Sequence, residues 1–227
     1  QIKREVPERK EGFCDDDACT DKLPRAEAIA RELGKLGVTW SCNAKANVKR
    51  ETLEVLRDNG CRLLLVGYES GNQKILHNVK KGLLVDVARR FTKDCHELGL
   101  TIHGTFILGL PGETHESIVA QAGVLSRLPL TTLKMHQLQL IRGTRMALEY
   151  RQHPEDFHLF GVDEYIDLVI DYIEHLRPDL VLERFVSQSP KELLIAPDWG
   201  LKNYEFNHRV QKRMKELGAY QGKKYEM

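Results

Sequence analysis

Hydrophobic positions along this chain follow two periodicities, that of an amphipathic helix and that of a buried strand. Five stretches have helical spacing of apolar residues, and short apolar runs lie between them. The predicted helices are Leu23–Leu36, Arg50–Asn59, Leu84–Leu98, His115–Arg127 and Val162–Leu176; the predicted strands are Val38–Cys42, Cys61–Tyr68, Ile102–Leu108, Thr132–Ile141 and Leu180–Val186. Apolar strands that alternate with helices of this length predict an α/β fold, in which helices cover a parallel sheet.

The segment Thr101–Thr114, TIHGTFILGLPGET, is the most distinctive part of this pattern. A buried strand runs directly into Gly109-Leu110-Pro111-Gly112, and Glu113 and Thr114 then begin a helix. Glycine accepts backbone conformations that other residues avoid, and proline fixes its own φ, so a compact loop with accessible backbone is expected. A loop at the carboxyl end of a parallel strand is where α/β proteins bind small molecules.

Composition limits the class of protein without naming a partner. The 227 residues are 41% hydrophobic and carry a formal net charge of +1, which indicates one core of ordinary size and no strong charge-driven binding. No apolar run approaches the roughly 20 residues of a membrane span. The five cysteines are an odd number at irregular spacing, which favours a reducing, cytoplasmic location over a disulfide framework.

Polar side chains recur where the predicted strands end, and there they would meet at one edge of the sheet. The set suits a polar, nucleoside-like ligand. It comprises Asp15, Asp16 and Asp17 before the first helix, then Asn43, Lys45, Glu69 and Ser70, and later Gln137, Gln139, Arg142 and Thr144. Simpler interpretations stay open, because an acidic run before a helix is often a solvated cap and Glu69-Ser70 precedes a short helix.

The first half of the chain resembles a known enzyme family. The run WSCNAKANVKRETLEVLRDNGCRLLLVGYESGNQKILHNVKKG, together with HGTFILGLPGET, resembles the core of radical S-adenosylmethionine (SAM) enzymes. From about Val6 to Thr114 the likeness is to cobalamin-binding radical SAM proteins of hopanoid biosynthesis. The resemblance implies a partial (β/α)6 barrel that uses SAM and a [4Fe–4S] cluster.

The second half resembles another branch of the same superfamily. From about His115 to Tyr225 the sequence is similar to an uncharacterised bacterial radical SAM group with an elongator-type core. Both branches share the Leu-Gly-Leu-Pro-Gly-Glu turn. We therefore expect a chimera whose join lies in or just after that turn.

The resemblance also implies roles for individual residues. The family's Phe-x-Asp-Asp position, which faces the amino group of SAM, falls on Phe13 and the three aspartates. The ribose and carboxylate contacts fall on Glu69 and Ser70, and the adenine contact on Ile107 and Gly109. With the polar strand ends included, the residues expected to bind SAM are Asp15, Asp16, Asp17, Asn43, Lys45, Glu69, Ser70, Ile107, Gly109 and Gly112.

The cysteines depart from the family pattern. A [4Fe–4S] cluster needs three thiolates from one short loop, spaced C-x3-C-x2-C in this superfamily. Here Cys14 and Cys19 form C-x4-C, and the next cysteine is Cys42. We expect no metal site from these residues. The first barrel strand and a cobalamin domain are also missing from the sequence, so an incomplete barrel is expected.

The remaining expectations concern domains and partners. We expect a barrel core at residues 1–186 and a helical extension at 187–227 that packs on it. The segment Lys202–Lys224 is basic and contains aromatic residues, which allows an RNA-facing surface or a plain solvated helix. An open sheet edge would favour self-association. The alternatives to an enzyme core are thus an RNA-binding module and a non-catalytic α/β scaffold.

Overall fold

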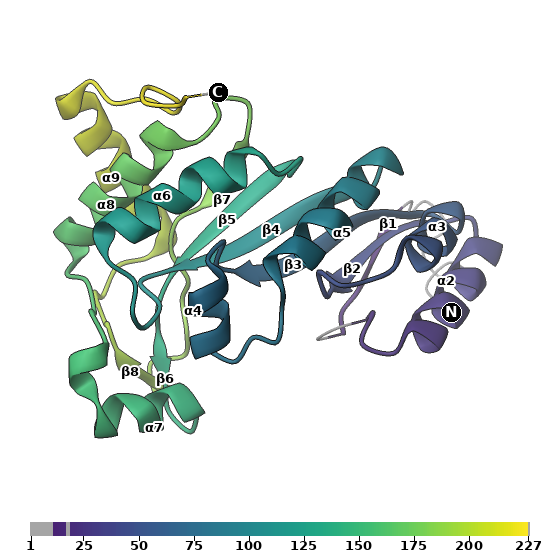
Figure 1. The fold of residues 1–227 in the computed structure, drawn as a ribbon, viewed down its shortest axis with the longest axis horizontal. Helices are drawn as coiled ribbons and strands as arrows, with labels where there is room; N and C mark the ends of the chain where they lie inside the picture. Colours follow the sequence, from purple (N-terminus) through teal and green to yellow (C-terminus); the bar gives the residue numbers. More distant parts are fainter. Residues whose placement is uncertain (1–10, 17–18, 227) are drawn as a thin grey trace. The chain divides into compact units, whose positions relative to one another are not determined.

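The computed structural model describes residues 11–16 and 19–226. It confirms the predicted α/β fold, a partial radical SAM-type barrel with a six-stranded parallel sheet in the order β1-β2-β3-β4-β5-β7. These strands are β1 (Glu11–Cys14), β2 (Thr39–Ala44), β3 (Cys61–Glu69), β4 (Thr101–Leu108), β5 (Thr132–Gln137) and β7 (Val181–Arg184). Figure 1 shows them with the helices that connect them. Asp17, one of the expected SAM residues, lies outside the described residues.

The helices fall close to their predicted positions. Short elements that the hydrophobic pattern does not resolve accompany them. The helices are α2 (Leu23–Lys35), α3 (Arg50–Asp58), α4 (Gln73–Asn78), α5 (Val85–Glu97), α6 (His115–Ser126), α7 (Arg145–Gln152), α8 (Val162–His175) and α9 (Asn203–Leu217), with a 3-10 turn at Pro154–Asp156. The strands β6 (Leu140–Ile141) and β8 (Leu194–Ala196) form a separate antiparallel pair.

The chain divides into two compact units. Unit 1 contains residues 1–68, 83–105 and 128–132, and unit 2 contains residues 69–82, 106–127 and 133–227. The boundary expected at residue 186 is not among the places where the chain passes between these units. That expected division remains a prediction about domain organisation.

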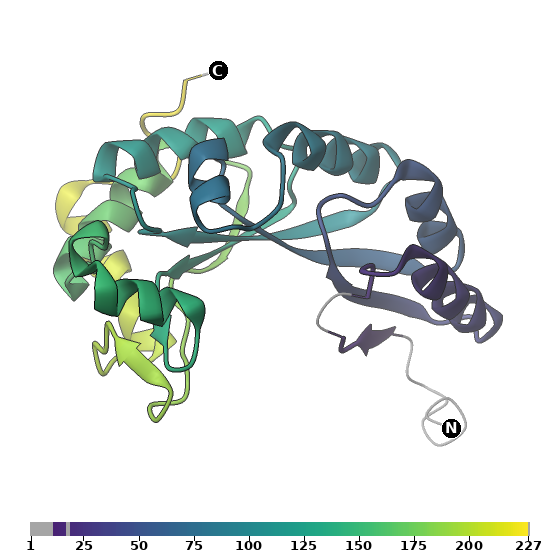
Figure 2. The same ribbon diagram turned by 60° about the horizontal axis from the view of Figure 1, so that its bottom comes forward.

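Unit 1 holds strands β1 and β2 and the helices α2, α3 and α5. Strand β1 pairs in parallel with β2, so that Cys14 lies opposite Cys42. Helix α3 packs against both α2 and α5, and Figure 2 shows the helices of this unit. Trp40 anchors the core: its side chain is 1% exposed, and its indole N–H donates to the carbonyl of Asn59 at 2.8 Å.

Gly60 shows why a glycine ends α3. Its φ is +89°, and a Cβ at this position would lie 2.5 Å from the carbonyl oxygen of Val38. An L side chain would be strained by the backbone conformation and would collide with the neighbouring backbone. The tight passage from α3 into β3 therefore requires glycine, as the sequence pattern predicts.

Unit 2 is held by helix packing and by an aromatic cluster. Helix α6 packs on α8, and α8 packs on α9. Tyr165, Trp199 and Phe206 meet with ring centroids 5.2 to 5.8 Å apart. The single predicted strand Thr132–Ile141 is divided in two, because β5 stays in the main sheet whereas β6 leaves it to pair with β8.

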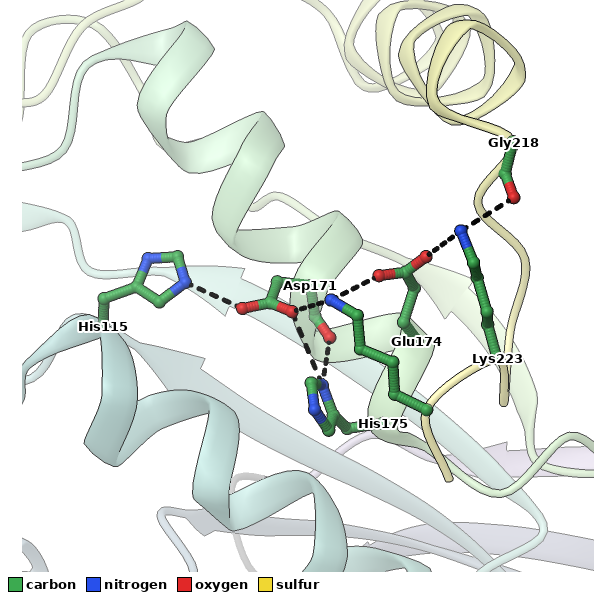
Figure 3. A network of polar contacts seen from close by, with 7 residues as sticks. His115, Asp171, Glu174, His175, Gly218 and Lys223 are labelled. Atoms are coloured by element: carbon green, nitrogen blue, oxygen red, sulfur yellow. Dashed lines mark hydrogen bonds and ion pairs between the residues drawn. The ribbon is translucent and has the colours of Figure 1, made fainter. Parts of the chain in front are cut away.

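The C-terminal residues are fastened to α8 by a polar network that we call the Lys224 clasp (Figure 3). The ammonium of Lys224 lies 2.7 Å from a carboxylate oxygen of Asp171 and 2.7 Å from one of Glu174. Lys223 lies 3.4 Å from Glu174, and His115 lies 3.0 Å from Asp171 (Figure 3). The backbone N–H of Lys224 also donates to the carbonyl of Glu174 at 2.8 Å. The clasp thus ties α6, α8 and the chain end within unit 2.

No helix in residues 11–16 or 19–226 is both long enough and apolar enough to cross a membrane.

Candidate functional site

The loop after β4 is organised by one buried carboxylate, Glu113. Its Oε2 accepts hydrogen bonds from the backbone N–H groups of Gly109 at 3.0 Å and of Leu110 at 2.9 Å. Glu113 is 8% exposed. The carboxylate therefore closes the Gly-Leu-Pro-Gly turn on itself and fixes the path of its backbone, because each bond joins a charged acceptor to a main-chain donor.

The other oxygen of this carboxylate reaches the loop after β3. Oε1 of Glu113 accepts from the amide of Gln121 at 2.7 Å and lies 3.3 Å from the hydroxyl of Ser70. The Ser70 hydroxyl lies 2.8 Å from Oε1 of Gln121, which also accepts from the N–H of Gly71 at 2.7 Å. We call Ser70, Gly71, Gly109, Leu110, Glu113 and Gln121 the Glu113 network. It holds two strand-end loops of unit 2 in one arrangement.

Burial raises the pKa of Glu113, and the hydrogen bonds from Gln121, Leu110, Gly109 and Ser70 oppose that rise. The pKa of Glu113 is raised overall, although four groups donate hydrogen bonds to its carboxylate. These hydrogen bonds link the carboxylate to both strand-end loops.

Gly109 and Ile107 are the expected adenine contacts. Gly109 has a φ of +89°, and a Cβ there would lie 2.9 Å from the ring of Phe160. The missing side chain therefore makes room for the protein's own aromatic ring. Ile107 is partly buried and packs against a cluster that includes Ile75, Leu110 and Leu140.

The other expected residues of unit 2 differ in exposure. Glu69 has a φ of +65°, and its carboxylate lies 2.7 Å from the ammonium of Lys81. Ser70 is 4% exposed, and its hydroxyl belongs to the Glu113 network. Gly112 has a φ of +85°, and a Cβ there would meet nothing closer than 3.7 Å. Gly112 is therefore the most open position of the loop backbone.

In unit 1 the structure brings Asp16 and Asn43 together. The side-chain amide of Asn43 donates to the carbonyl of Asp16 at 2.9 Å. The carboxylate of Asp16 pairs with Arg25 at 2.6 Å. Lys45 pairs instead with Asp21, a residue that we did not select from the sequence, and Asp15 is exposed. The acidic segment before α2 is thus partly neutralised by bases of its own unit.

The cysteines near this segment form a line of thiols. Cys19 and Cys42 are both fully buried, and Cys14 is half-buried. A hydrogen bond with Cys42, together with burial, raises the pKa of Cys19, and burial raises that of Cys14. Within residues 11–16 and 19–226, no group of three or more His, Cys, Asp or Glu side chains is arranged to hold a metal ion.

Several side chains of the basic C-terminal segment make contacts within unit 2. Phe206 is fully buried in the aromatic cluster of unit 2, and Arg213 is paired with Asp167 at 3.0 Å. Lys223 and Lys224 belong to the clasp. Tyr204 is 67% exposed and Arg209 is also exposed, and the paired side chains of Arg213, Lys223 and Lys224 remain 38% to 47% exposed.

Four residues of the Glu113 network were not among the residues expected to bind SAM: Gly71 and Leu110, which contribute backbone N–H groups, and Glu113 and Gln121, which contribute side chains. Glu113 directly follows the Gly-rich loop. Its position four residues after Gly109, the glycine that follows β4, is the sequence feature from which its role could have been predicted. Gln121 lies one turn further along α6 than any capping position and has no such signal. Its role appears only when β3 and β4 are neighbours in the sheet.

Comparisons with known proteins agree with this architecture. A family model described as the radical SAM superfamily matches residues 14–121, and one described as the Radical_SAM C-terminal domain matches residues 130–216. An uncharacterised protein of Methanocaldococcus jannaschii is 30% identical over 183 residues, which is 78% of this chain and 56% of that protein.

Two solved structures share the fold. Elp3 of Methanocaldococcus infernus matches with a TM-score of 0.78 at 14% identity, over 96% of this chain and 58% of that one. The radical SAM methyltransferase TsrM of Kitasatospora setae matches with a TM-score of 0.59 at 20% identity, over 63% of this chain and 31% of that one.

The extent of these matches bears on the expected chimera. The chain spans about half the length of the curated relative, whose 183-residue alignment is too long to lie on one side of the Leu-Gly-Leu-Pro-Gly-Glu turn. One natural protein therefore accounts for sequence on both sides of that turn, and two parents are not required. With two radical SAM models matching successive parts of it, the chain belongs to the radical SAM superfamily.

Proposed function

We propose that this chain is the SAM-binding core of a radical SAM enzyme, and that the loop after β4 lies against the adenine of SAM. The observation that carries the proposal is the Glu113 network. It fixes the backbone of Gly109 and Leu110 beside the partly buried Ile107. A preorganised loop of this kind presents backbone and apolar surface to a flat ligand without an ordering cost at binding.

Within the same unit, Glu69 and Ser70 are proposed to serve the ribose and carboxylate of SAM. Glu69 suits this role better, because its carboxylate is 20% exposed whereas Ser70 is buried and bonded. Asp15, Asp16, Asn43 and Lys45 are proposed contacts for the methionine end. In unit 1, Asp16 and Asn43 lie side by side.

Radical SAM family membership implies a [4Fe–4S] cluster as well as SAM. The cysteines that the structure describes do not fit that cluster, since none of them joins a group arranged to hold a metal. Cys19 and Cys42 are moreover buried thiols with raised pKa values, which disfavours the thiolate that iron requires. A hydrogen bond with Cys42 and burial raise the pKa of Cys19; the bond with Cys19 lowers that of Cys42, but a bond with Cys61 and burial more than offset it. No step of the radical chemistry is assigned to them.

Calorimetric titration with S-adenosylhomocysteine tests the proposal. The 227-residue chain should bind it, and Ile107→Ser should weaken binding about fivefold by removing apolar contact with the adenine. The matched control is Leu148→Ser, because Leu148 is 56% exposed on α7 of the same unit. Absence of binding at millimolar ligand, or equal weakening by both variants, would overturn the proposal.

A further inference from the structure

Three basic side chains gather on neighbouring strands of unit 2. Lys134 and His136 are two residues apart on β5, so their side chains leave the same face of that strand. Strand β7, which neighbours β5 in the sheet, carries Arg184. The charge of Arg184 acts on both Lys134 and His136. The three groups therefore lie within electrostatic reach of one another.

Two nitrogens of this group are buried without a hydrogen-bond partner. They are Nε2 of His136 and Nε of Arg184. The Nε of arginine always carries a proton, so the Nε–H of Arg184 is a buried donor without an acceptor. Buried donors are nearly always satisfied in folded proteins, and one that is not requires an explanation such as strain, a bound water or a bound ion.

The charge of the cluster points the same way. Burial and then the charge of Arg184 lower the pKa of Lys134, and burial with Arg184 and Lys134 lowers that of His136 to about 4. Glu183 is a carboxylate that acts on Lys134 in the opposite sense, with a smaller effect than Arg184. Like charges on adjacent strands destabilise a sheet, so this arrangement favours the arrival of an anion.

Other bases of unit 2 contrast with this cluster. Lys81 is paired with Glu69, Arg213 with Asp167, and Lys224 with two carboxylates. These three surface bases are thus neutralised, whereas Nε2 of His136 and Nε of Arg184, beside Lys134, have no hydrogen-bond partner. That contrast makes Lys134, His136 and Arg184 a candidate binding site for an anion.

We propose that Lys134, His136 and Arg184 form an oxyanion-binding site that takes a phosphate or carboxylate group of the substrate. Arg184 would offer a charge-assisted N–H, Lys134 its ammonium, and neutral His136 an N–H in its Nε2–H tautomer. This goes beyond the proposed SAM function and does not require it, because the site is built from β5 and β7 alone.

The test is a titration of the full chain with inorganic phosphate at constant ionic strength, followed by ¹H–¹⁵N spectra of the histidine rings. His136 is assigned from its loss in His136→Gln. Its ring nitrogens should shift and saturate with a dissociation constant below roughly 10 mM. Lys134→Met and Arg184→Met should each weaken binding about tenfold or more.

The matched control is Lys215→Met, which removes the same charge from an exposed position in the last turn of α9. It should leave phosphate binding unchanged. Thermal unfolding of each variant without phosphate verifies folding, and Lys134→Met should unfold no earlier than the parent, because it relieves like-charge repulsion.

Acetate in place of phosphate distinguishes the two oxyanion sources: saturable shifts with only one of them assign that group to the site. A lack of saturable shifts with both, or equal weakening by Lys134→Met and Lys215→Met, would overturn the proposal. Binding of SAM that weakens in Lys134→Met without any phosphate binding would also overturn it, since the oxyanion would then belong to the cofactor.

Discussion

The Glu113 network and the Lys224 clasp are two carboxylate systems in the same unit that work in different ways. Glu113 is buried and receives neutral donors from backbone and amide groups. Asp171 and Glu174 pair with the ammonium groups of lysines whose side chains remain 38% to 47% exposed. The first system fixes the shape of the loop that we propose lies against SAM, and the second holds the end of the chain against α8. The contrast separates a loop scaffold from a structural fastener.

Their pKa values differ in direction. Burial raises the pKa of Glu113. Burial also opposes ionisation of Asp171 and Glu174, but Lys224 and its neighbours more than offset it, so both of their pKa values are lowered. Ionised carboxylates are therefore tolerated in the Glu113 network and favoured in the clasp.

Glu113→Ala should give the largest effect. It leaves the N–H groups of Gly109 and Leu110 and the amide of Gln121 without their acceptor. Unfolding free energy should fall by about 3 kcal/mol or more, measured by urea denaturation. Glu192→Ala, at an exposed position of the same unit, is the control. A loss no greater than that of the control would show that the network does not organise the loop.

Gly109→Ala should rank second. The φ of +89° strains any L residue, and the new Cβ would lie 2.9 Å from the Phe160 ring unless that ring moves. We expect a loss of about 2 kcal/mol by the same measurement. Combining it with Phe160→Leu should recover part of the loss. A fully tolerated Gly109→Ala would contradict the tight packing of this loop.

Lys224→Met should cost less, about 1 kcal/mol, because its ion pairs are partly screened by solvent and Lys223 still faces Glu174. Glu174→Gln should cost less again, since the lysines that it releases can turn to water. Chemical denaturation of both variants tests this order. If Lys224→Met cost as much as Glu113→Ala, the distinction between scaffold and fastener would fail.

The pH dependence should show the smallest effects, with signs that separate the groups. The raised pKa of Glu113 means that stability is lost as pH rises above the unfolded value of about 4.3, so Glu113→Gln should flatten that loss. The lowered pKa values of Asp171 and Glu174 mean that stability is lost as pH falls below about 4, which Glu174→Gln should reduce.

Titration of His136 should make stability depend on pH in a third range. Its pKa of about 4 lies below the unfolded value of about 6.5, so stability should fall as pH drops between these values. Lys134 and Arg184 are the charges that act on it. His136→Gln should remove that slope in thermal midpoints measured between these two pH values. An unchanged slope would contradict the lowered pKa that burial and the charges of Arg184 and Lys134 give to His136.

The sequence predicts the larger elements of this fold well, for a physical reason. Hydrophobic periodicity and helix-stopping glycines are local, and they place α3, β3 and α6 within two residues of the structure. The prediction of one strand at Thr132–Ile141 was wrong at its C-terminal end, where β6 forms a separate strand. The pairing of β6 with β8 depends on a segment more than fifty residues away.

The site was predicted only in part for the same reason. Gly109 and Gly112 carry a local signature, and their positive φ values confirm the tight turn. The bond from Ser70 to Gln121 spans 51 positions, and Lys224 meets Asp171 across 53. Contacts of that separation follow from strand order and helix packing, which a single sequence does not display.

An amide ¹H–¹⁵N titration with S-adenosylhomocysteine tests the central claim most directly. Binding to the loop after β4 predicts saturable shifts at Gly109, Leu110 and Gly112, with little change at Gly218 and Gly222 near the clasp. Shifts confined to the clasp, or none at millimolar ligand, would contradict the assignment of this loop to SAM.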